Sequence, residues 1–326
     1  IVTNALGTNE YIFIKSTGQD IVERVLLVAH SNGTEIRLNG NAGAPDYVIN
    51  SGEYLDLNGS NFDAQGNLYV QSSKNVFAYQ TIGDDSRTDF ANQELFFVPP
   101  LSCETPKLID NIPLINQIGT RTYSISKITL ITKSTATLNF QINGVNNTLA
   151  AISAIPGVVV TGPTIVNTSL GSYDTYIITG LAGNIGVYST AELYLAAYGT
   201  DGAATFGGFY SGFIFKPEIT FNLLNITQNN CIPNALLNVN SLSSFDTFQW
   251  YFNGNPIPLA NQNFYNPLVA GYYYVKAAIG NCGTNEISSD EIPISSCPID
   301  SDNDLANDNI DIDFDNDGIP NCEESV

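Results

Sequence analysis

The chain has 326 residues, and its 32 acidic against 11 basic residues give a formal net charge of -21. Such a chain lacks the basic patches that bind nucleic acid or anionic lipid, so we expect neither partner. No apolar run reaches the ~18 residues of a membrane-spanning helix, and the single histidine excludes most zinc-site and hydrolase chemistry.

Short runs rich in Val, Ile, Thr, Tyr and Phe recur between Asn, Gly and Ser turns, and helical periodicity is nearly absent. Regular strands of this kind predict β-sandwiches. Asn-Gly pairs take positive φ easily and therefore predict hairpin tips, as at Asn32-Gly33, Asn39-Gly40, Asn143-Gly144 and Asn253-Gly254. In chain order, the predicted strands cover residues 23–29, 34–38, 68–71, 76–81, 128–132, 137–142, 174–179 and 193–197.

Two parts of the chain are similar to each other. Gly66–Ser73 aligns with Gly183–Thr190, and Arg37–Gly40 aligns with Gln141–Gly144. This internal repeat predicts two related β-units, at residues 1–100 and 101–217. Chance similarity between β-rich segments is the alternative explanation.

The front two-thirds of the chain also resembles a known family. Tyr47–Glu53, Val70–Tyr79 and Asn92–Ser102 follow one another in an order similar to the N-terminal domain type of IgGFc-binding proteins. That domain type occurs in many bacterial surface proteins. The resemblance implies a fold and a location outside the cell more than it implies a ligand.

Residues 218–297 contain a Trp strand and a Tyr strand. Trp250 lies in a central-strand pattern, and Gly271–Val275 places Tyr273 where a tyrosine corner is expected. This region resembles the small immunoglobulin-like domains of bacterial surface proteins. It departs from antibody domains at Cys282, which follows the tyrosine strand.

The five cysteines of an exported protein suggest disulfides. We expect Cys231–Cys282 at the edge of the third domain and Cys297–Cys322 at the two ends of the acidic segment. Cys103 is then left over as a buried free thiol, with an intermolecular bridge as the alternative.

Residues 298–326 hold eight Asp, two Glu and no basic residue. From Asp313 to Glu324 the spacing fits the D-x-D-x-D-G-x₅-E loop, whose alternate carboxylates converge on a calcium ion. A weaker copy begins at Asp300, with Leu305 in place of the turn glycine. The alternative is a solvated, disordered acidic tail. The predicted ligands of Ca²⁺ are Asp300, Asp302, Asp304, Asp308, Asp311, Asp313, Asp315, Asp317, Asn321 and Glu324.

The stretch from Cys297 to Cys322 is similar to thrombospondin type 3 calcium repeats. Bacterial forms of these repeats connect domains in giant surface proteins, notably type IX secretion substrates and gliding adhesins. The resemblance implies a calcium-rigidified connector at 298–326 and a native chain that continues beyond Val326.

Catalytic interpretations find little support. His30 stands beside a turn, and no G-x-S-x-G elbow accompanies it, so we expect a surface or structural histidine. A glycosidase needs only two carboxylates, and the sequence alone does not exclude acidic side chains in that role, although solvated loop charges are the simpler explanation. Tyrosines that could stack sugars are more often packing residues. The acids considered are Asp84, Asp85, Asp89 and Glu94, and the tyrosines are Tyr54, Tyr210, Tyr265 and Tyr272.

Together these patterns predict an all-β protein of tandem sandwiches, an immunoglobulin-like sandwich and a calcium-binding acidic segment. The expected function is a non-enzymatic, exported cell-surface adhesin or filament segment, and a fragment of a larger protein. Its expected partners are further domains of the same protein, surface glycans or other cell-surface proteins. The alternatives are a carbohydrate-binding module of a secreted hydrolase and a hydrolase within this chain.

Overall fold

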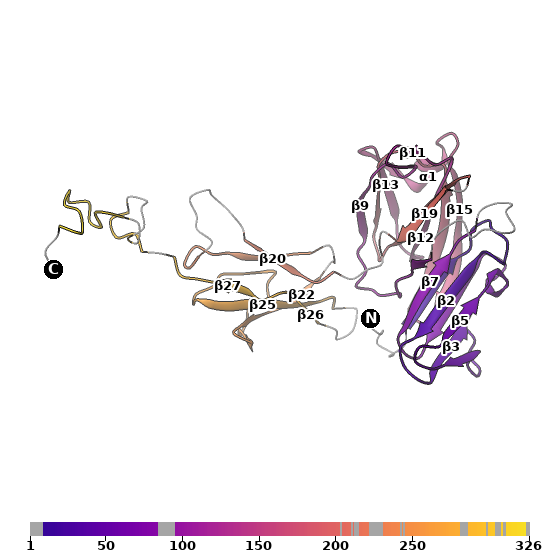
Figure 1. Ribbon diagram of the computed structural model, residues 1–326, viewed down its shortest axis with the longest axis horizontal. Helices are drawn as coiled ribbons and strands as arrows, with labels where there is room; N and C mark the ends of the chain where they lie inside the picture. The colour runs from indigo at the N-terminus through magenta and orange to yellow at the C-terminus, as the bar shows by residue number, and fades with distance from the viewer. Residues whose placement is uncertain are drawn as a thin grey trace. The chain divides into compact units, whose positions relative to one another are not determined.

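Nearly all regular structure in the chain is β-strand, arranged in two compact units (Figure 1). The first unit holds strands β1–β19 and the second holds β20–β27. Within the described part of the chain, no helix has the length and hydropathy needed to cross a bilayer. The computed structural model describes residues 9–83, 95–202, 204–209, 211, 215–221, 231–241, 243, 245–280, 286–297, 299–303, 308 and 311–323.

The first sandwich consists of two antiparallel four-stranded sheets. One has the order β1-β6-β3-β4, at Asn9–Ile14, Asn67–Ser72, Thr34–Leu38 and Tyr47–Ile49. The other has the order β5-β2-β7-β8, at Tyr54–Leu57, Arg24–Ala29, Val76–Thr81 and Phe96–Phe97. A single 3₁₀ turn, η1, spans Gly59–Asn61.

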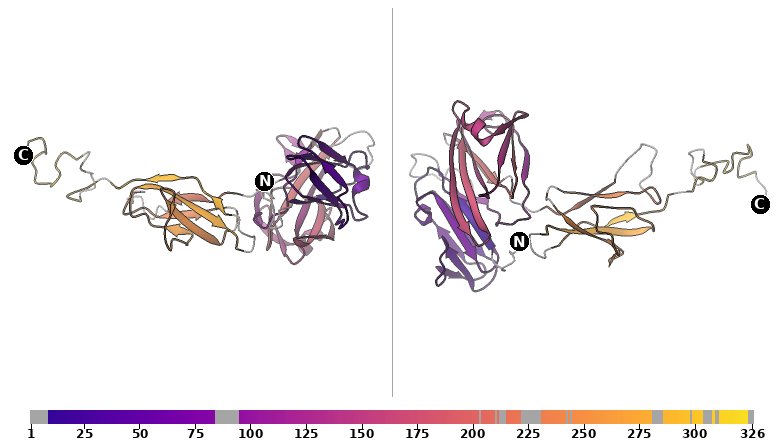
Figure 2. Two further views of the ribbon diagram at one scale, coloured as in Figure 1. Left: turned by 90° about the horizontal axis from the view of Figure 1, so that it is seen from below. Right: turned by 180° about the vertical axis from the view of Figure 1, so that it is seen from behind.

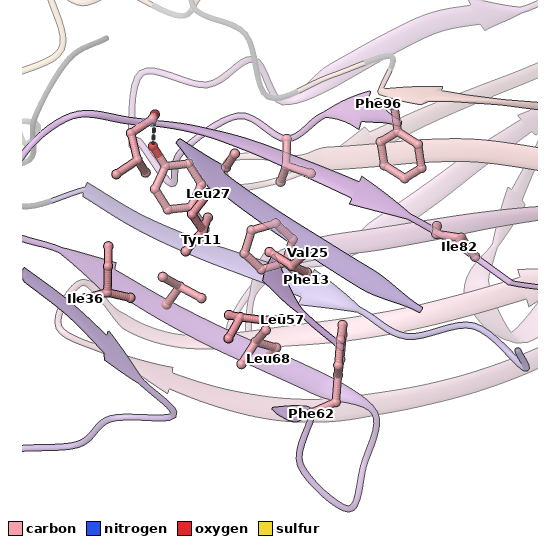
Figure 3. Close-up of a cluster of buried hydrophobic side chains, with 14 of the residues drawn as sticks. Tyr11, Phe13, Val25, Leu27, Ile36, Leu57, Phe62, Leu68, Ile82 and Phe96 are labelled. Carbon is pink, nitrogen blue, oxygen red and sulfur yellow. Dashed lines mark hydrogen bonds between the residues drawn. The ribbon is translucent and has the colours of Figure 1, made fainter. Parts of the chain in front are cut away.

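Alternation along the strands builds the core of this sandwich. Strand β2 buries Val25, Leu27 and Ala29 and leaves the residues between them half-buried, as a period of two requires. Figure 3 shows Val25 and Leu27 beside the rings of Tyr11 and Phe13 from β1. The Tyr11 hydroxyl donates to the Val76 carbonyl at 3.1 Å. Burial of the phenol without a charged partner raises the pKa of Tyr11 above its usual range.

The second sandwich has the same plan. Its four-stranded sheet has the order β14-β13-β17-β9, at Val145–Thr148, Leu138–Ile142, Ile185–Ser189 and Leu108–Ile112. Its five-stranded sheet has the order β15-β16-β12-β18-β19, at Val159–Thr168, Gly171–Thr179, Ile125–Lys133, Tyr194–Asp201 and Ala204–Phe209. A short hairpin of β10 (Gln117–Ile118) and β11 (Arg121–Thr122) and a one-turn helix α1 (Leu149–Ser153) complete it.

The two sandwiches repeat one topology. The order β1-β6-β3-β4 corresponds to β9-β17-β13-β14, and β5-β2-β7-β8 corresponds to β16-β12-β18-β19. The aligned segments of the sequence repeat fall on corresponding strands, β6 with β17 and β3 with β13. The internal similarity therefore has a structural counterpart.

The two sandwiches also bury a shared face. Tyr69 and Ile12 from the first sandwich pack against Tyr173 and Tyr194 from the second. Glu10, fully buried, accepts hydrogen bonds from the Tyr69 hydroxyl at 2.6 Å and from the backbone N–H and hydroxyl of Ser169. Strands β1–β8 lie within the predicted unit 1–100 and strands β9–β19 within 101–217. The two sandwiches nevertheless belong to one compact unit.

The second unit is a smaller two-sheet sandwich. One sheet has the order β20-β21-β24, at Glu218–Phe221, Leu237–Asn240 and Phe264–Tyr265. The other has the order β23-β22-β25-β26, at Asn255–Pro256, Thr247–Phe252, Gly271–Ala278 and Ile287–Ser288, with β27 (Ile292–Ile294) also paired to β25.

The core of this sandwich is centred on Trp250, which is fully buried and donates its indole N–H to the Gln262 carbonyl at 2.9 Å. Tyr273 donates its hydroxyl to the Val269 carbonyl at 2.7 Å. A buried tyrosine bonded back to the chain just upstream is the tyrosine corner, so the predicted role of Tyr273 is confirmed.

Most predicted strands agree with the observed ones to within a few residues. The runs at 34–38 and 76–81 coincide with β3 and β7. The largest shortfall in length is at 128–132, because the observed strand β12 covers Ile125–Lys133. Three of the four predicted Asn-Gly tips have positive φ at both residues, for example 50° at Asn39 and 75° at Gly40. At Asn32-Gly33 only the glycine has positive φ, at 62°.

The predicted disulfides are wrong. Cys231 pairs with Cys297, at a Cα–Cα distance of 4.9 Å, and Cys322 is exposed and free. The reason is topological: Ile232 donates its N–H to Ser295 O, and Cys297 donates its N–H to Ile232 O, so the two segments run side by side. Cys103, expected as a free thiol, is disulfide-bonded. Cys282 lies outside the described residues.

Candidate metal centre

The acidic segment consists of turns without a helix or strand among its described residues (Figure 2). Within it, one carboxylate oxygen from each of Asp313, Asp315 and Asp317 lies within 4.8 Å of the others. Two oxygens that bind one Ca²⁺ at about 2.3–2.6 Å lie no more than ~5 Å apart. The three carboxylates therefore have the spacing of ligands that share one calcium ion.

Local hydrogen bonds of the aspartates produce this convergence. Asp315 Oδ1 accepts from the N–H of Asp317 at 3.3 Å, and Asp317 Oδ1 accepts from the N–H of Ile319 at 2.9 Å. Each is an Asx turn, in which a carboxylate bonds to the backbone two residues later. The turns use one oxygen of each carboxylate to shape the chain.

Asp313 closes the loop from its other end. Its Oδ2 accepts from the N–H of Gly318 at 2.9 Å, and Gly318 has a φ of +89°, which glycine adopts without strain. Its Oδ1 is buried and has no hydrogen-bond partner. A buried carboxylate oxygen without a donor is costly unless a cation or water lies against it. The residues present therefore fit a divalent cation.

Charge leads to the same requirement. No Lys or Arg occurs in residues 298–326, so no side chain of the segment compensates the three carboxylates. At separations near 5 Å each pair of unit charges repels by about 1 kcal/mol in water, and by more beside a protein surface. A hard divalent cation removes this repulsion and turns it into attraction.

Two other predicted ligands hold the base of the loop. Asp311 Oδ1 accepts from the N–H of Asp313 at 2.9 Å. Asn321 Oδ1 accepts from the N–H of Phe314 at 2.9 Å, while its amide nitrogen donates to Asp311 O at 3.3 Å. Asn321 therefore positions the backbone that carries the carboxylates. The predicted ligand Glu324 lies outside the described residues.

The weaker copy of the loop repeats the same hydrogen bonds 13 residues earlier in the chain. The N–H of Asp308 donates to Ile299 O at 2.8 Å, and 13 residues later the N–H of Asn321 donates to Ile312 O at 2.7 Å. Asp308 Oδ1 accepts from Ser301 N–H, as Asn321 Oδ1 accepts from Phe314 N–H. Asn303 and Asn316 both have positive φ, 65° and 57°.

Among the other predicted ligands of this copy, Asp300 Oδ1 accepts from the N–H of Asn303 at 2.8 Å. Asp302, the residue before Asn303, is half-buried. Asp304 lies outside the described residues, as does Leu305, which replaces the turn glycine. Because these hydrogen bonds recur at an interval of 13 residues, the two copies have the same local structure in the part that is described.

Of the residues considered for catalysis or sugar stacking, the four that the structure describes do not gather into a site. His30 is exposed, with Nδ1 3.3 Å from the Ser31 hydroxyl. Tyr54 and Tyr272 are exposed on different units, whereas Tyr265 packs against Trp250 with ring centroids 5.8 Å apart. Tyr210 and the four acids Asp84, Asp85, Asp89 and Glu94 lie outside the described residues.

Sequence reasoning missed one group of polar side chains, on the outward face of the four-stranded sheet of the second sandwich. Asn139 and Gln141 of β13 lie there with Tyr188 of β17. The available signal was their alternation with buried residues such as Phe140 and Val187. Alternation shows that these side chains face outward, but only the register shows that they are neighbours.

Comparisons with known proteins give one family match. A family model described as "IgGFc binding protein" matches residues 3–199. No curated protein matches the chain. Among solved structures, the major pilin subunit BcpA of Bacillus cereus is similar at 12% identity over 89% of this chain and 96% of that one, with a TM-score of 0.19. A score this low supports no argument, so the all-β assignment depends on the strands themselves.

Proposed function

The chain belongs to the IgGFc-binding protein family, and from that premise we propose that it is a non-enzymatic, exported adhesin or filament segment of a cell surface. Its sandwiches supply length and contact surface. Its acidic segment is a connector to further domains of the same protein, of the thrombospondin type 3 kind, and Ca²⁺ makes that connector rigid.

The observation that carries this proposal is the loop of Asp313, Asp315 and Asp317, with its close carboxylate oxygens and the unpartnered Asp313 Oδ1. A segment with this much negative charge and few apolar residues lacks a hydrophobic core to order it. Calcium binding to the ordered state supplies the missing free energy by mass action. A joint ordered in this way transmits force and direction between domains.

The Cys231–Cys297 disulfide supports the mechanical role. Cys297 is the residue at which the acidic segment leaves the sandwich of the second unit, and the disulfide ties it to Cys231, between β20 and β21 of that unit. Load on the connector therefore reaches a covalent crosslink before it reaches the hydrogen bonds of β27. Disulfides also persist mainly in oxidising compartments, which agrees with export.

The calcium proposal is tested by calorimetric titration of the full chain with CaCl₂ and by limited proteolysis with and without EGTA. We expect two bound Ca²⁺ ions, with dissociation constants in the ~0.1–1 mM range of extracellular modules, and faster cleavage between residues 300 and 323 in EGTA. Asp315→Asn with Asp317→Asn should abolish one of the two binding events and reproduce the faster cleavage in the presence of calcium.

The matched control is Glu218→Gln with Glu291→Gln, which removes two exposed acids of the same unit outside the segment. This control should bind calcium like the unmodified chain. Cleavage that is equally slow in calcium and in EGTA would contradict the rigid-connector proposal. Turnover of a polysaccharide by the purified chain would contradict the non-enzymatic assignment.

A further inference from the structure

The four-stranded sheet β14-β13-β17-β9 carries a small hollow on its outward face, in the second sandwich of the first unit. Figure 1 labels two of its strands, β9 and β13. The register places two ranks of side chains across this face. One rank runs through Asn139, Tyr188 and Leu108, and the other through Asn146, Gln141 and Gly186.

Gly186 lies in the lining of the hollow and contributes no side chain to it. It lies between Gln141 of β13 and the irregular pairing of β17 with β9, where the register shifts between Ile185 and Val187. A Cβ at this position would lie 2.7 Å from the Asp110 carbonyl oxygen, so a larger residue requires the backbone to move. The hollow has a volume of about 160 Å³ and is lined by residues of β9, β13, β14 and β17.

The walls of the hollow combine one aromatic ring with planar polar groups. Tyr188 is 46% exposed and borders the hollow. Gln141 and Asn146 are exposed and joined by a 3.4 Å hydrogen bond, and Asn139 and Asp110 complete the polar lining. Each amide offers both donors and an acceptor, and the carboxylate accepts only.

We propose that this hollow binds one residue of a neutral glycan. A sugar ring has an apolar C–H face that suits an aromatic ring and a rim of hydroxyls that each donate and accept, which matches amides and a carboxylate. The volume is below the ~300–1,000 Å³ of sites that enclose a whole drug-sized ligand, so it suits one unit of a longer chain. A neutral glycan would then be the ligand class of the adhesin proposed above, and this inference depends on that adhesive role.

Other ligand classes fit less well. A peptide strand that adds to a sheet pairs with the free backbone groups of an edge, whereas this hollow lies on the face over β13 and β17. An anionic sugar would meet the Asp110 carboxylate and a chain with a net charge of -21, without a basic residue in the lining. The ligand should therefore be uncharged.

The test uses the full chain on an array of neutral hexose and N-acetylhexosamine oligosaccharides, with sialylated forms of the same glycans alongside. The strongest neutral binder is then titrated by calorimetry. We expect Tyr188→Ala to weaken its binding at least tenfold. Asn146→Trp, which places a large ring at the rim of the hollow, should weaken it by a similar factor.

The matched control is Tyr54→Ala, which removes a 68%-exposed tyrosine from β5 in the other sandwich and should leave binding unchanged. EGTA should also leave binding unchanged, because no lining residue belongs to the acidic segment. This separates failure of the glycan site from failure of the calcium connector. Binding to sialylated glycans alone, binding to no glycan, or full binding by both hollow variants would overturn the proposal.

Discussion

Removing the Cys231–Cys297 disulfide should strongly destabilise the sandwich of the second unit. The crosslink closes a loop with a sequence separation of 66 residues, which contains most strands of that sandwich. Loop-closure entropy for this length gives about 4 kcal/mol in the free energy of unfolding, within the ~2–5 kcal/mol lost when native disulfides are removed from small domains. The change to test is Cys231→Ala with Cys297→Ala.

Trp250 makes the measurement specific. It is the only tryptophan in the chain and is fully buried in this sandwich, so its fluorescence reports unfolding of the second unit alone. With a urea dependence of about 1–2 kcal/mol per M for a small domain, the midpoint should fall by ~2–4 M, or the domain should be unfolded without urea. The control Cys322→Ala removes the exposed free cysteine and should not move the midpoint.

A midpoint for the double variant within ~0.5 M of the unmodified chain would refute the entropic reasoning. Peptide mapping provides a second, independent check. The non-reduced chain should yield a crosslinked fragment that joins residues 231 and 297. A crosslink from Cys231 to any other cysteine would instead refute the pairing.

Three further predictions concern buried polar groups. Burial raises the pKa of Glu23 to about 7 from its ordinary 4.5 despite three backbone N–H donors, so the folded chain holds a proton that the unfolded chain releases. The stability from this group is complete below about pH 4.5 and is lost as the pH rises to about 7. The free energy of unfolding should therefore fall by about 3 kcal/mol over this pH range, and Glu23→Gln should abolish that fall. Urea unfolding followed by circular dichroism measures it. Ser169→Ala removes a hydroxyl donor to the buried Glu10 carboxylate and should lower the calorimetric stability of the first unit by ~2 kcal/mol. Tyr273→Phe removes the bond to Val269 and should cost ~1 kcal/mol, read by Trp fluorescence.

Each of these has a control on the same unit. Glu53→Gln alters an exposed glutamate and should leave the pH dependence unchanged, and equal slopes for Glu23→Gln and the unmodified chain would contradict the burial argument. Ser172→Ala removes an exposed hydroxyl of β16, and an equal loss there would mean that Ser169 has no special role. Tyr272→Phe, at an exposed neighbour of the corner, should be neutral.

The sequence by itself determined the local features of this protein. Short runs rich in Val, Ile, Thr, Tyr and Phe between turn residues located strands such as β3 and β7, and Asn-Gly pairs located tips with positive φ such as Asn39-Gly40. The spacing of Asp313, Asp315 and Asp317 was enough to predict neighbouring carboxylates, because each aspartate shapes its own turn within a few residues. Such signals succeed because the interacting groups are close along the chain.

Only the tertiary structure decided which distant segments meet. The pairing of Cys231 with Cys297 depends on two strand ends that run side by side, and the buried bond from Ser169 to Glu10 depends on two sandwiches sharing a face. The hollow beside Tyr188 and Gly186 likewise depends on the register of four strands. A shift of one residue in any strand reverses its outward and inward side chains, and nothing within a single strand fixes its register against its partners.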